Sequence, residues 1–171
     1  MSNARSGAFG AVPQAPRNVP SAPAPGGGDV EVRWAADDRE LAAAVSVREQ
    51  VFCREQGVPK EEELDGLDDR ALHLVAVEPG GGRIVATLRL LPGGGEAKIG
   101  RVAVERRWRR RGIASRMLAM ALLRARELGC ERARLAAQTQ ATSLYEQAGF
   151  TVESARFEEA GIPHVWMGRE L

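Results

Sequence analysis

The sequence of 171 residues predicts a mixed α/β domain, built on a mostly antiparallel sheet that contains one central parallel pair of strands. Two observations lead to this prediction. Strand-like runs joined by short glycine-rich loops occupy residues 71–104, which is the pattern of an antiparallel meander. A strand, an amphipathic helix and a second strand then follow over residues 98–138, and such a unit in one sheet normally forms a right-handed parallel crossover.

The composition indicates one domain and argues against several classes of protein. A net charge of +1 gives no sign of a chain built to bind nucleic acid or a membrane surface. Cys53 and Cys130 form no Cys-x-x-Cys pair, so they predict neither a disulfide framework nor a zinc site. The sequence shows no apolar run of transmembrane length and no signal-peptide core. We therefore expect a cytoplasmic protein with no metal and no membrane partner.

Residues 1–28 differ from the rest of the chain. They hold five of the nine prolines, together with alanine, glycine and serine, and almost no periodic apolar residues. Such a segment buries too little surface to offset the entropy lost on ordering. We expect a disordered tail over residues 1–28 and a folded domain over residues 29–171.

The folded domain is expected to open with a strand and a helix. Apolar residues alternate over residues 30–34, which predicts a short strand. Asp37 or Asp38 then caps a helix, because an aspartate side chain accepts hydrogen bonds from the free N–H groups of a first turn. An apolar stripe from Leu41 to Phe52 predicts the length of this helix.

The remaining elements follow from the same periodicities. Two helices are predicted, one from Gly112 to a glycine stop at Leu128-Gly129 and a shorter one over residues 141–148. Strands are predicted over residues 71–77, 83–91, 98–104, 133–138, 151–157 and 163–167.

The turn between the strand at 98–104 and the following helix carries the pattern Arg109-x-x-Gly112-x-Ala114. A helix start offers unpaired N–H groups and the positive end of the helix dipole, and small residues let an anion approach the backbone. The pattern therefore predicts a cradle for a pyrophosphate. The alternative is a solvated, arginine-rich turn with a helix cap.

In its strand–loop–helix setting, this turn resembles the acyl-CoA loop of the GNAT family of CoA-dependent N-acetyltransferases. Three further stretches support the resemblance. The segment SLYEQAGF at 143–150 resembles the C-terminal signature of the family. Two others resemble a bacterial subgroup typified by the ElaA and YjcF proteins: the pattern Arg48-x-x-Val51-Phe52-x-x-Glu55-Gln56, and the segment Glu159-Ala160-Gly161-Ile162-Pro163-His164.

The resemblance implies the GNAT fold, whose central parallel strands splay apart, and direct transfer of an acetyl group from acetyl-CoA to an amine without a metal. It implies that the strand ending at Val104 polarises the thioester carbonyl through its backbone, with Val102 and Val104 as the main contacts. The residues expected to bind the cofactor on this basis are Val102, Ala103, Val104, Arg109, Arg110, Arg111, Gly112, Ile113, Ala114, Ser115 and Gln138. Tyr145 matches the tyrosine that protonates the departing thiolate, and its alternative role is a packed aromatic.

The acceptor side is less specified by the sequence. Attack requires a neutral amine, which calls for a carboxylate or histidine base. The candidates are Glu55, Asp65, Glu158 and His164, each with an ordinary capping, turn or surface role as its alternative. Arg101 is a candidate for binding a carboxylate or phosphate of the acceptor, or for pairing with Glu55 or Asp65.

The acceptor itself is expected to be a small-molecule or peptide amine of unidentified structure. The acidic residues over 61–69 favour a cationic amine, although a mobile surface loop would have the same composition. His73, in an alternating strand, is interpreted as a strand histidine rather than a catalytic one. A homodimer is compatible with the resemblance.

Three alternative functions are compatible with parts of the sequence. An acyl-homoserine-lactone synthase shares the fold, but the arginine-rich CoA loop disfavours it. A GNAT-fold domain that binds acyl-CoA without catalysis is disfavoured by Tyr145 and the intact loop. A nucleic-acid-binding module would use the cluster Arg106–Arg111, but no aromatic stripe or second basic run supports it, and we expect no nucleic-acid partner.

Overall fold

The computed structural model describes residues 29–171, so the tail predicted over residues 1–28 lies outside the described part of the chain. The strands are β1 (Glu31–Trp34), β2 (Leu72–Val77), β3 (Ile84–Gly93), β4 (Glu96–Val104), β5 (Arg132–Gln138), β6 (Thr151–Val152), β7 (Phe157–Glu159) and β8 (Ile162–Glu170). The α-helices are α1 (Asp38–Arg48), α2 (Lys60–Glu63), α3 (Ile113–Glu127) and α4 (Thr142–Gln147). Short helical turns of other types are η1 (Glu49–Glu55), η2 (Asp68–Arg70), η3 (Arg106–Trp108) and η4 (Thr139–Ala141).

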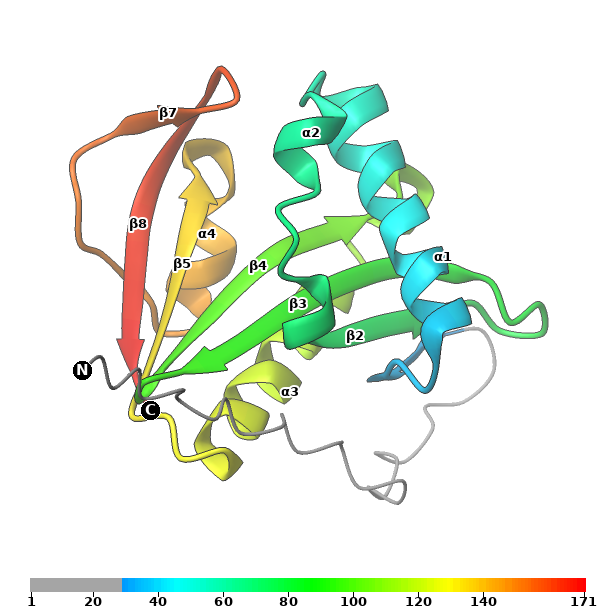
Figure 1. Ribbon diagram of the computed structural model, residues 1–171, viewed down its shortest axis with the longest axis horizontal. Coiled ribbons are helices and arrows are strands. Elements are labelled where there is room, and N and C mark those ends of the chain that lie inside the picture. The colour runs from blue at the N-terminus through cyan, green and yellow to red at the C-terminus, as the bar shows by residue number, and fades with distance from the viewer. Residues whose placement is uncertain (1–28) are drawn as a thin grey trace, which may run out of the picture.

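The strands form one sheet in the order β1-β2-β3-β4-β5-β8-β6, with β7 paired to β8 (Figure 1). Only β4 and β5 run parallel, and every other pair is antiparallel. The predicted fold class, a mostly antiparallel sheet with one central parallel pair, is therefore confirmed.

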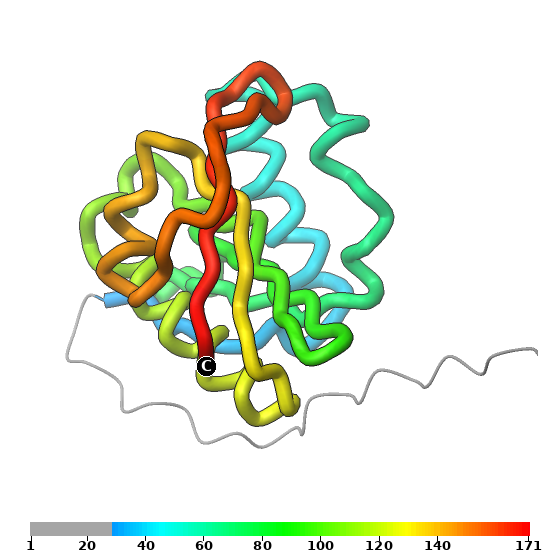
Figure 2. The backbone as a smooth tube through the Cα atoms, turned by 90° about the vertical axis from the view of Figure 1, so that its left-hand side faces the viewer, coloured from blue at the N-terminus to red at the C-terminus, as the bar shows by residue number. Residues whose placement is uncertain are grey.

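Helices cover both faces of the sheet. Figure 2 shows α1 and α2 on one side, and α3 and α4 on the other. The larger core lies under α3, whose buried residues are Ile113, Met117, Leu118, Ala121, Leu122 and Ala125. A smaller core lies between α1 and strands β2, β3 and β4. No helix within residues 29–171 is long and apolar enough to cross a membrane.

The first helix differs from its predicted form. Asp37 caps it as one of the two predicted residues, accepting a hydrogen bond of 2.9 Å from the backbone N–H of Glu40. The α-helix ends at Arg48, and the chain continues as the π-helical segment η1. The apolar stripe extending to Phe52 does not distinguish an α-helix from a π-helix. Residues four apart share a face in an α-helix and nearly share one in the wider π-helix.

The acidic stretch over residues 60–69 contains two short helical segments and is anchored by ion pairs. It forms α2 and η2, and three of its carboxylates pair with arginines of α1 and β3. Arg48 is fully buried and cannot be deprotonated in a protein, so it requires buried counter-charges. The stretch packs against the sheet because it supplies them.

Two features of β4 open the centre of the sheet. The parallel ladder with β5 covers only Glu96–Lys98 opposite Arg132–Arg134, and the two strands then diverge (Figure 1). On the other side, the pair Arg89–Gly100 is followed by Thr87–Ala103, so β4 holds one more residue than β3 between these pairs. This extra residue is a β-bulge.

The C-terminal strands also depart from the prediction. The strand predicted over residues 151–157 is two short strands, β6 and β7, separated by a loop. The strand predicted over residues 163–167 is longer and runs from Ile162 to Glu170, where it pairs with β5 along its length. The hairpin of β7 and β8 lies beside β5, on the side of β5 that faces away from β4 (Figure 1).

Candidate active site at the splay of the sheet

A cavity of about 520 Å³ lies where β4 and β5 diverge. Its walls come from η1, β4, β5, α4 and the β7–β8 hairpin, so it reaches both faces of the sheet. The predicted site residues that line it are Arg101, Val102, Val104, Arg109, Ala114, Gln138, Tyr145 and His164. Those that do not line it are Glu55, Asp65, Ala103, Arg110, Arg111, Gly112, Ile113, Ser115 and Glu158.

The backbone of β4 faces this cavity without a partner strand. Within the described sheet, Arg101 and Val102 have no partner in the register of β3 or of β5. Because a backbone N–H is an obligatory donor, an unpaired one beside a cavity is a ready donor for a ligand oxygen. Ala103 is 2 % exposed and packs on the α1 side of the sheet, so its side chain is a core residue.

The loop after β4 leaves the start of α3 free for an anion. Gly112 takes a left-handed conformation, with φ of +73°, and no side chain from the described residues caps the first turn of the 15-residue helix. Arg110 is also left-handed, with φ of +60°. The side chain of Ile113 is buried in the core, so its backbone rather than its side chain faces the turn.

The arginines of this loop have separate partners. Arg109 donates to the carbonyl oxygen of Val104 at 2.8 Å and pairs with Glu55 at 2.7 Å. The guanidinium of Arg111 lies 4.7 Å from the ring centre of Trp108. Two arginines of the cluster Arg106–Arg111, Arg109 and Arg111, are thus engaged by different parts of the protein.

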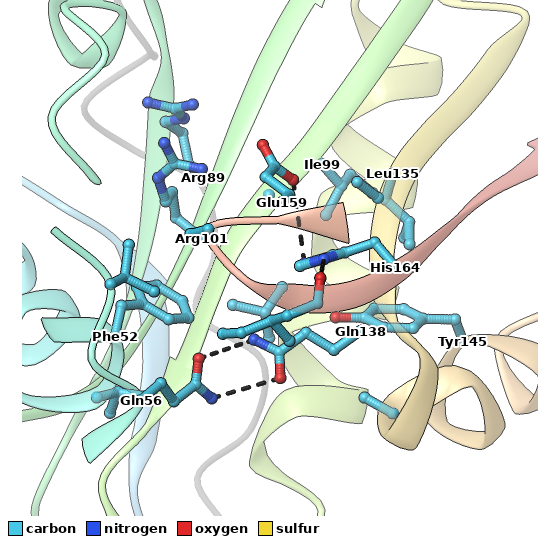
Figure 3. A pocket seen from close by; sticks show the side chains of 18 of the residues that line it. Phe52, Gln56, Arg89, Ile99, Arg101, Leu135, Gln138, Tyr145, Glu159 and His164 are labelled. Carbon is cyan, nitrogen blue, oxygen red and sulfur yellow. Dashed lines mark hydrogen bonds and ion pairs between the residues drawn. The ribbon is translucent and has the colours of Figure 1, made fainter. Parts of the chain in front are cut away.

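A pair of carboxamides joins the two sides of the cavity. Gln138, at the end of β5, donates to Gln56 Oε1 at 2.8 Å, and Gln56 donates back to Gln138 Oε1 at 3.4 Å. Figure 3 shows this pair between the side that carries Phe52 and the side that carries Tyr145. Gln56 directly follows η1, so this contact holds the end of the π-helical segment against β5.

Tyr145 presents its hydroxyl to the cavity, while its ring packs in the core. The ring meets Phe150 edge-on, with centroids 6.3 Å apart, and Figure 3 shows the hydroxyl directed toward the middle of the site. Burial raises the pKa of Tyr145 to about 12, because the phenolate would lose its solvation. The phenol therefore keeps its proton at neutral pH.

His164, on β8, has a defined tautomer when neutral. Its Nδ1 lies 2.7 Å from the carbonyl oxygen of Ile162, and a carbonyl only accepts, so Nδ1 carries the proton. Nε2 then bears the lone pair and lies 4.0 Å from a carboxylate oxygen of Glu159. The ring stacks on Phe157, with centroids 5.9 Å apart, which fixes its plane.

The other candidate bases have different surroundings. Glu55 pairs with Arg109 of the phosphate loop. Asp65 pairs with Arg89, which holds the pKa of the Asp65 carboxyl well below its usual range. Glu158 lies opposite Pro163 in the β7–β8 hairpin and does not line the cavity. Within residues 29–171 there is no cluster of three or more His, Cys, Asp or Glu side chains that could hold a metal ion.

Sequence reasoning missed two residues of the site. Glu159 approaches His164, whereas the sequence indicated its neighbour Glu158. Neighbouring residues of a strand point to opposite faces, and the pairing of Glu159 with Ile162 puts Glu159 on the face of His164. Gln56 was noted only as part of a family pattern, and its pairing with Gln138 joins positions 82 apart in sequence.

The comparisons with known proteins agree with this geometry. A family model for the acetyltransferase (GNAT) domain matches residues 35–171. The uncharacterized N-acetyltransferase YjcF of Bacillus subtilis is 34 % identical over 137 residues, which cover 80 % of this chain and 96 % of YjcF. An acyl-CoA N-acyltransferase structure from Pseudomonas aeruginosa is 31 % identical with a TM-score of 0.72, covering 83 % of this chain and 99 % of that one.

The structure of Escherichia coli ElaA has the same fold. Its TM-score is 0.73 at 24 % identity, over 82 % of this chain and 99 % of ElaA. The match of the family model and the relationship to YjcF confirm the resemblance seen in the sequence. The chain belongs to the GNAT family of acetyltransferases, with YjcF among its relatives and ElaA among its structural neighbours.

Proposed function

We propose that the protein is an N-acetyltransferase that transfers an acetyl group from acetyl-CoA to a primary amine by direct attack in a ternary complex, without a metal, in the cytoplasm. One observation carries the proposal. A single cavity is lined by the part of β4 that has no partner strand, by Tyr145 and by the imidazole of His164. These are a carbonyl-polarising group, an acid and a base, which acyl transfer to an amine requires.

The residues present fit an acyl-CoA. The uncapped first turn of α3, over Gly112 to Ser115, would hold the pyrophosphate, with Arg109, Arg110 and Arg111 close by to add charge. Val102, Val104 and Gln138 line the cavity beyond this turn and would flank the thioester arm. When bound, the thioester supplies an activated acetyl group and a thiolate leaving group.

His164 acts as the general base. His164 lines the cavity, and with Nδ1 bonded to the carbonyl oxygen of Ile162 its Nε2 would accept a proton from the acceptor ammonium or from the attacking amine. Glu159, 4.0 Å from Nε2, then stabilises the imidazolium by its opposite charge. The hydrogen bond from Nδ1 to Ile162 keeps the ring oriented through this change, as the third member of a triad does.

The backbone of β4 stabilises the charge that develops on the carbonyl oxygen. Val102 and Val104 line the cavity, and their backbone N–H groups would donate to the oxygen without reorganisation. Tyr145 would supply the proton that the leaving group needs. Its protonated hydroxyl donates to the sulfur and passes on the proton as the carbon–sulfur bond breaks, since a buried thiolate is strongly basic.

The first test follows thiol release from acetyl-CoA with a panel of primary amines: spermidine, tryptamine, glycine and a lysine-containing peptide. We expect turnover with at least one amine and a fall in kcat of roughly 10²-fold in Tyr145→Phe, which removes only the acid. Binding of acetyl-CoA, measured by calorimetry, should be unchanged in this variant. Equal kcat in both proteins would contradict the role of Tyr145, and binding without turnover on any amine would favour the non-catalytic module.

His164→Gln tests the base. The glutamine retains polarity and similar size but accepts no proton, so we expect kcat to fall about 10²-fold with acetyl-CoA affinity unchanged. Glu159→Gln serves as the graded comparison and should lose about 3- to 10-fold, because it removes only the stabilising charge. A smaller loss in His164→Gln than in Glu159→Gln would show that another group takes the proton.

A further inference from the structure

The residue at the bulge of β4 is unusual. Arg101 has a φ of +52°, in the left-handed region that side chains other than glycine rarely adopt. Such a conformation is strained and persists only where its surroundings hold it. The sequence gives β4 no glycine at this position, although Gly100 is adjacent. Something other than backbone preference must therefore keep Arg101 in this conformation.

The side chain of Arg101 is anchored at its far end. Its guanidinium donates to the carbonyl oxygen of Glu63, at 3.0 Å from Nη2 and 3.3 Å from Nε, and to Asp65 Oδ2 at 3.3 Å. It also lies 3.4 Å from the Glu63 carboxylate. These anchors belong to α2 and the loop after it, which cross over the α1 side of the sheet (Figure 1).

The anchors are themselves fixed by buried charges. Glu63 is 3 % exposed and pairs with the fully buried Arg48. Asp65 pairs with Arg89 at 2.6 Å, and Arg89 is the β3 residue directly opposite Gly100.

A third carboxylate, Asp68, closes the arrangement. It pairs with Arg48 at 2.7 Å and with Arg89 at 3.0 Å. We call the six residues the charge ring: Arg48, Glu63, Asp65, Asp68, Arg89 and Arg101. Three arginines balance three carboxylates within it, so no member is left over to bind an acceptor charge.

The bulge that Arg101 occupies decides where the next backbone groups point. An extra residue in one strand rotates the peptide groups that follow it and leaves them out of the ladder. Val102 comes next in the chain, and its N–H is one of the donors that the proposed reaction uses. A donor contributes only if it is aimed at the developing charge, and a displacement of about 1 Å can cost roughly 10²-fold in rate.

We infer that Arg101 is a positioning residue: the charge ring holds its side chain, and this holds the bulge that directs the Val102 N–H into the cavity. The inference rests on the proposed function and deepens it. It differs from the expectation that Arg101 binds a carboxylate or phosphate of the acceptor, because the guanidinium is already engaged by Glu63 and Asp65.

Arg101→Asn is the direct test. Asparagine accepts the left-handed conformation but is too short to reach Asp65. We expect a fall in kcat of about 10- to 100-fold with the KM of the acceptor unchanged, using acetyl-CoA and the amine of the panel that reacts fastest. A rise in the KM of an anionic acceptor at constant kcat would overturn the inference and support acceptor binding. Arg33→Asn is the matched control, because it breaks an arginine–carboxylate pair with Glu40 away from the cavity.

Amide resonances give a readout that general destabilisation does not move. In the ¹⁵N–¹H spectrum of the unmodified protein, acetyl-CoA should shift the Val102 amide proton downfield relative to CoA, since only acetyl-CoA offers the carbonyl. Arg101→Asn and Asp65→Asn should both lose this difference, and Arg33→Asn should retain it. Retention of the difference in Arg101→Asn would overturn the inference.

The two proposals fail in different ways. If acetyl-CoA shifts no resonance of the unmodified protein, the proposed function fails. The anchoring of the bulge is then tested without ligand, by measuring the ¹⁵N relaxation of residues 100–103 in Asp65→Asn. This substitution leaves β4 itself chemically unchanged. Increased mobility of these residues supports an anchored bulge, and relaxation equal to that of the unmodified protein refutes it.

Discussion

Replacement of Gly112 by glutamate is expected to abolish acetyl-CoA binding. Gly112 stands at the start of α3 with φ of +73°, and a Cβ built there meets no atom within 4 Å, so the glutamate side chain has room to lie over the first turn. Its carboxylate would occupy the anion site and repel the pyrophosphate, at a cost of about 4 kcal/mol or roughly 10³-fold in affinity. Calorimetric titration with acetyl-CoA measures the loss directly.

The matched control is Gly112→Ala, which adds the same backbone strain without the charge. A left-handed alanine costs on the order of 1 kcal/mol, so affinity should fall by no more than about 5-fold. Thermal unfolding of the two variants should agree, because the added groups point into open space. Equal affinities in the two variants would show that the start of α3 is not the phosphate site.

Replacement of Arg48 by methionine is expected to lower the free energy of unfolding by about 3–5 kcal/mol. Arg48 is fully buried, and methionine fills much of its volume but leaves Glu63 and Asp68 without their main partner. Glu63 is almost inaccessible to water, so its charge would remain uncompensated except by Arg101. Urea unfolding measures the lost free energy of unfolding as a shift of the transition midpoint, with the dependence of that free energy on urea concentration unchanged.

A second substitution separates charge from packing. In Arg48→Met combined with Glu63→Gln, the stranded carboxylate is removed, and we expect recovery of about half of the lost stability. A double variant as unstable as Arg48→Met would indicate that methionine fails to pack, rather than that a charge is stranded. If Arg48→Met is too unstable to purify, Glu63→Gln alone is measured instead, and we expect it to lower the free energy of unfolding by a smaller amount.

Much of the fold and one side of the site follow from local sequence. Alternation and helical periodicity located β2 to β5 and α3 within a few residues, because each pattern is read over neighbouring positions. The turn ending at Gly112 and the helix of Tyr145 could be placed for the same reason. Both lie within one strand–helix or strand–turn–helix unit.

The acceptor side could not be derived in this way, because it depends on pairings between distant segments. Glu63 and Asp65 look like members of a solvated acidic run, and only the folded chain brings them to Arg48 and Arg89. Nothing in the sequence around Arg101 marks a left-handed residue, since the usual signal is a glycine. Likewise, the choice between Glu158 and Glu159 required the register of a hairpin.

The carboxamides of Gln56 and Gln138 give the cavity a chemical preference at its middle. The two amides hydrogen-bond each other, and Gln140 Nε2 also donates to Gln138 Oε1 at 3.1 Å, so a ligand chain that enters between Gln56 and Gln138 has to replace the bonds that they exchange. A chain that carries amide groups of its own, such as the pantetheine arm of CoA, swaps one amide partner for another at nearly equal cost. An alkyl chain of the same width would break the hydrogen bonds between Gln56 and Gln138 without replacing them, and a buried group left without a partner costs about 1–3 kcal/mol. We therefore expect the pair to favour ligands that offer amide hydrogen bonds over purely apolar chains of the same width.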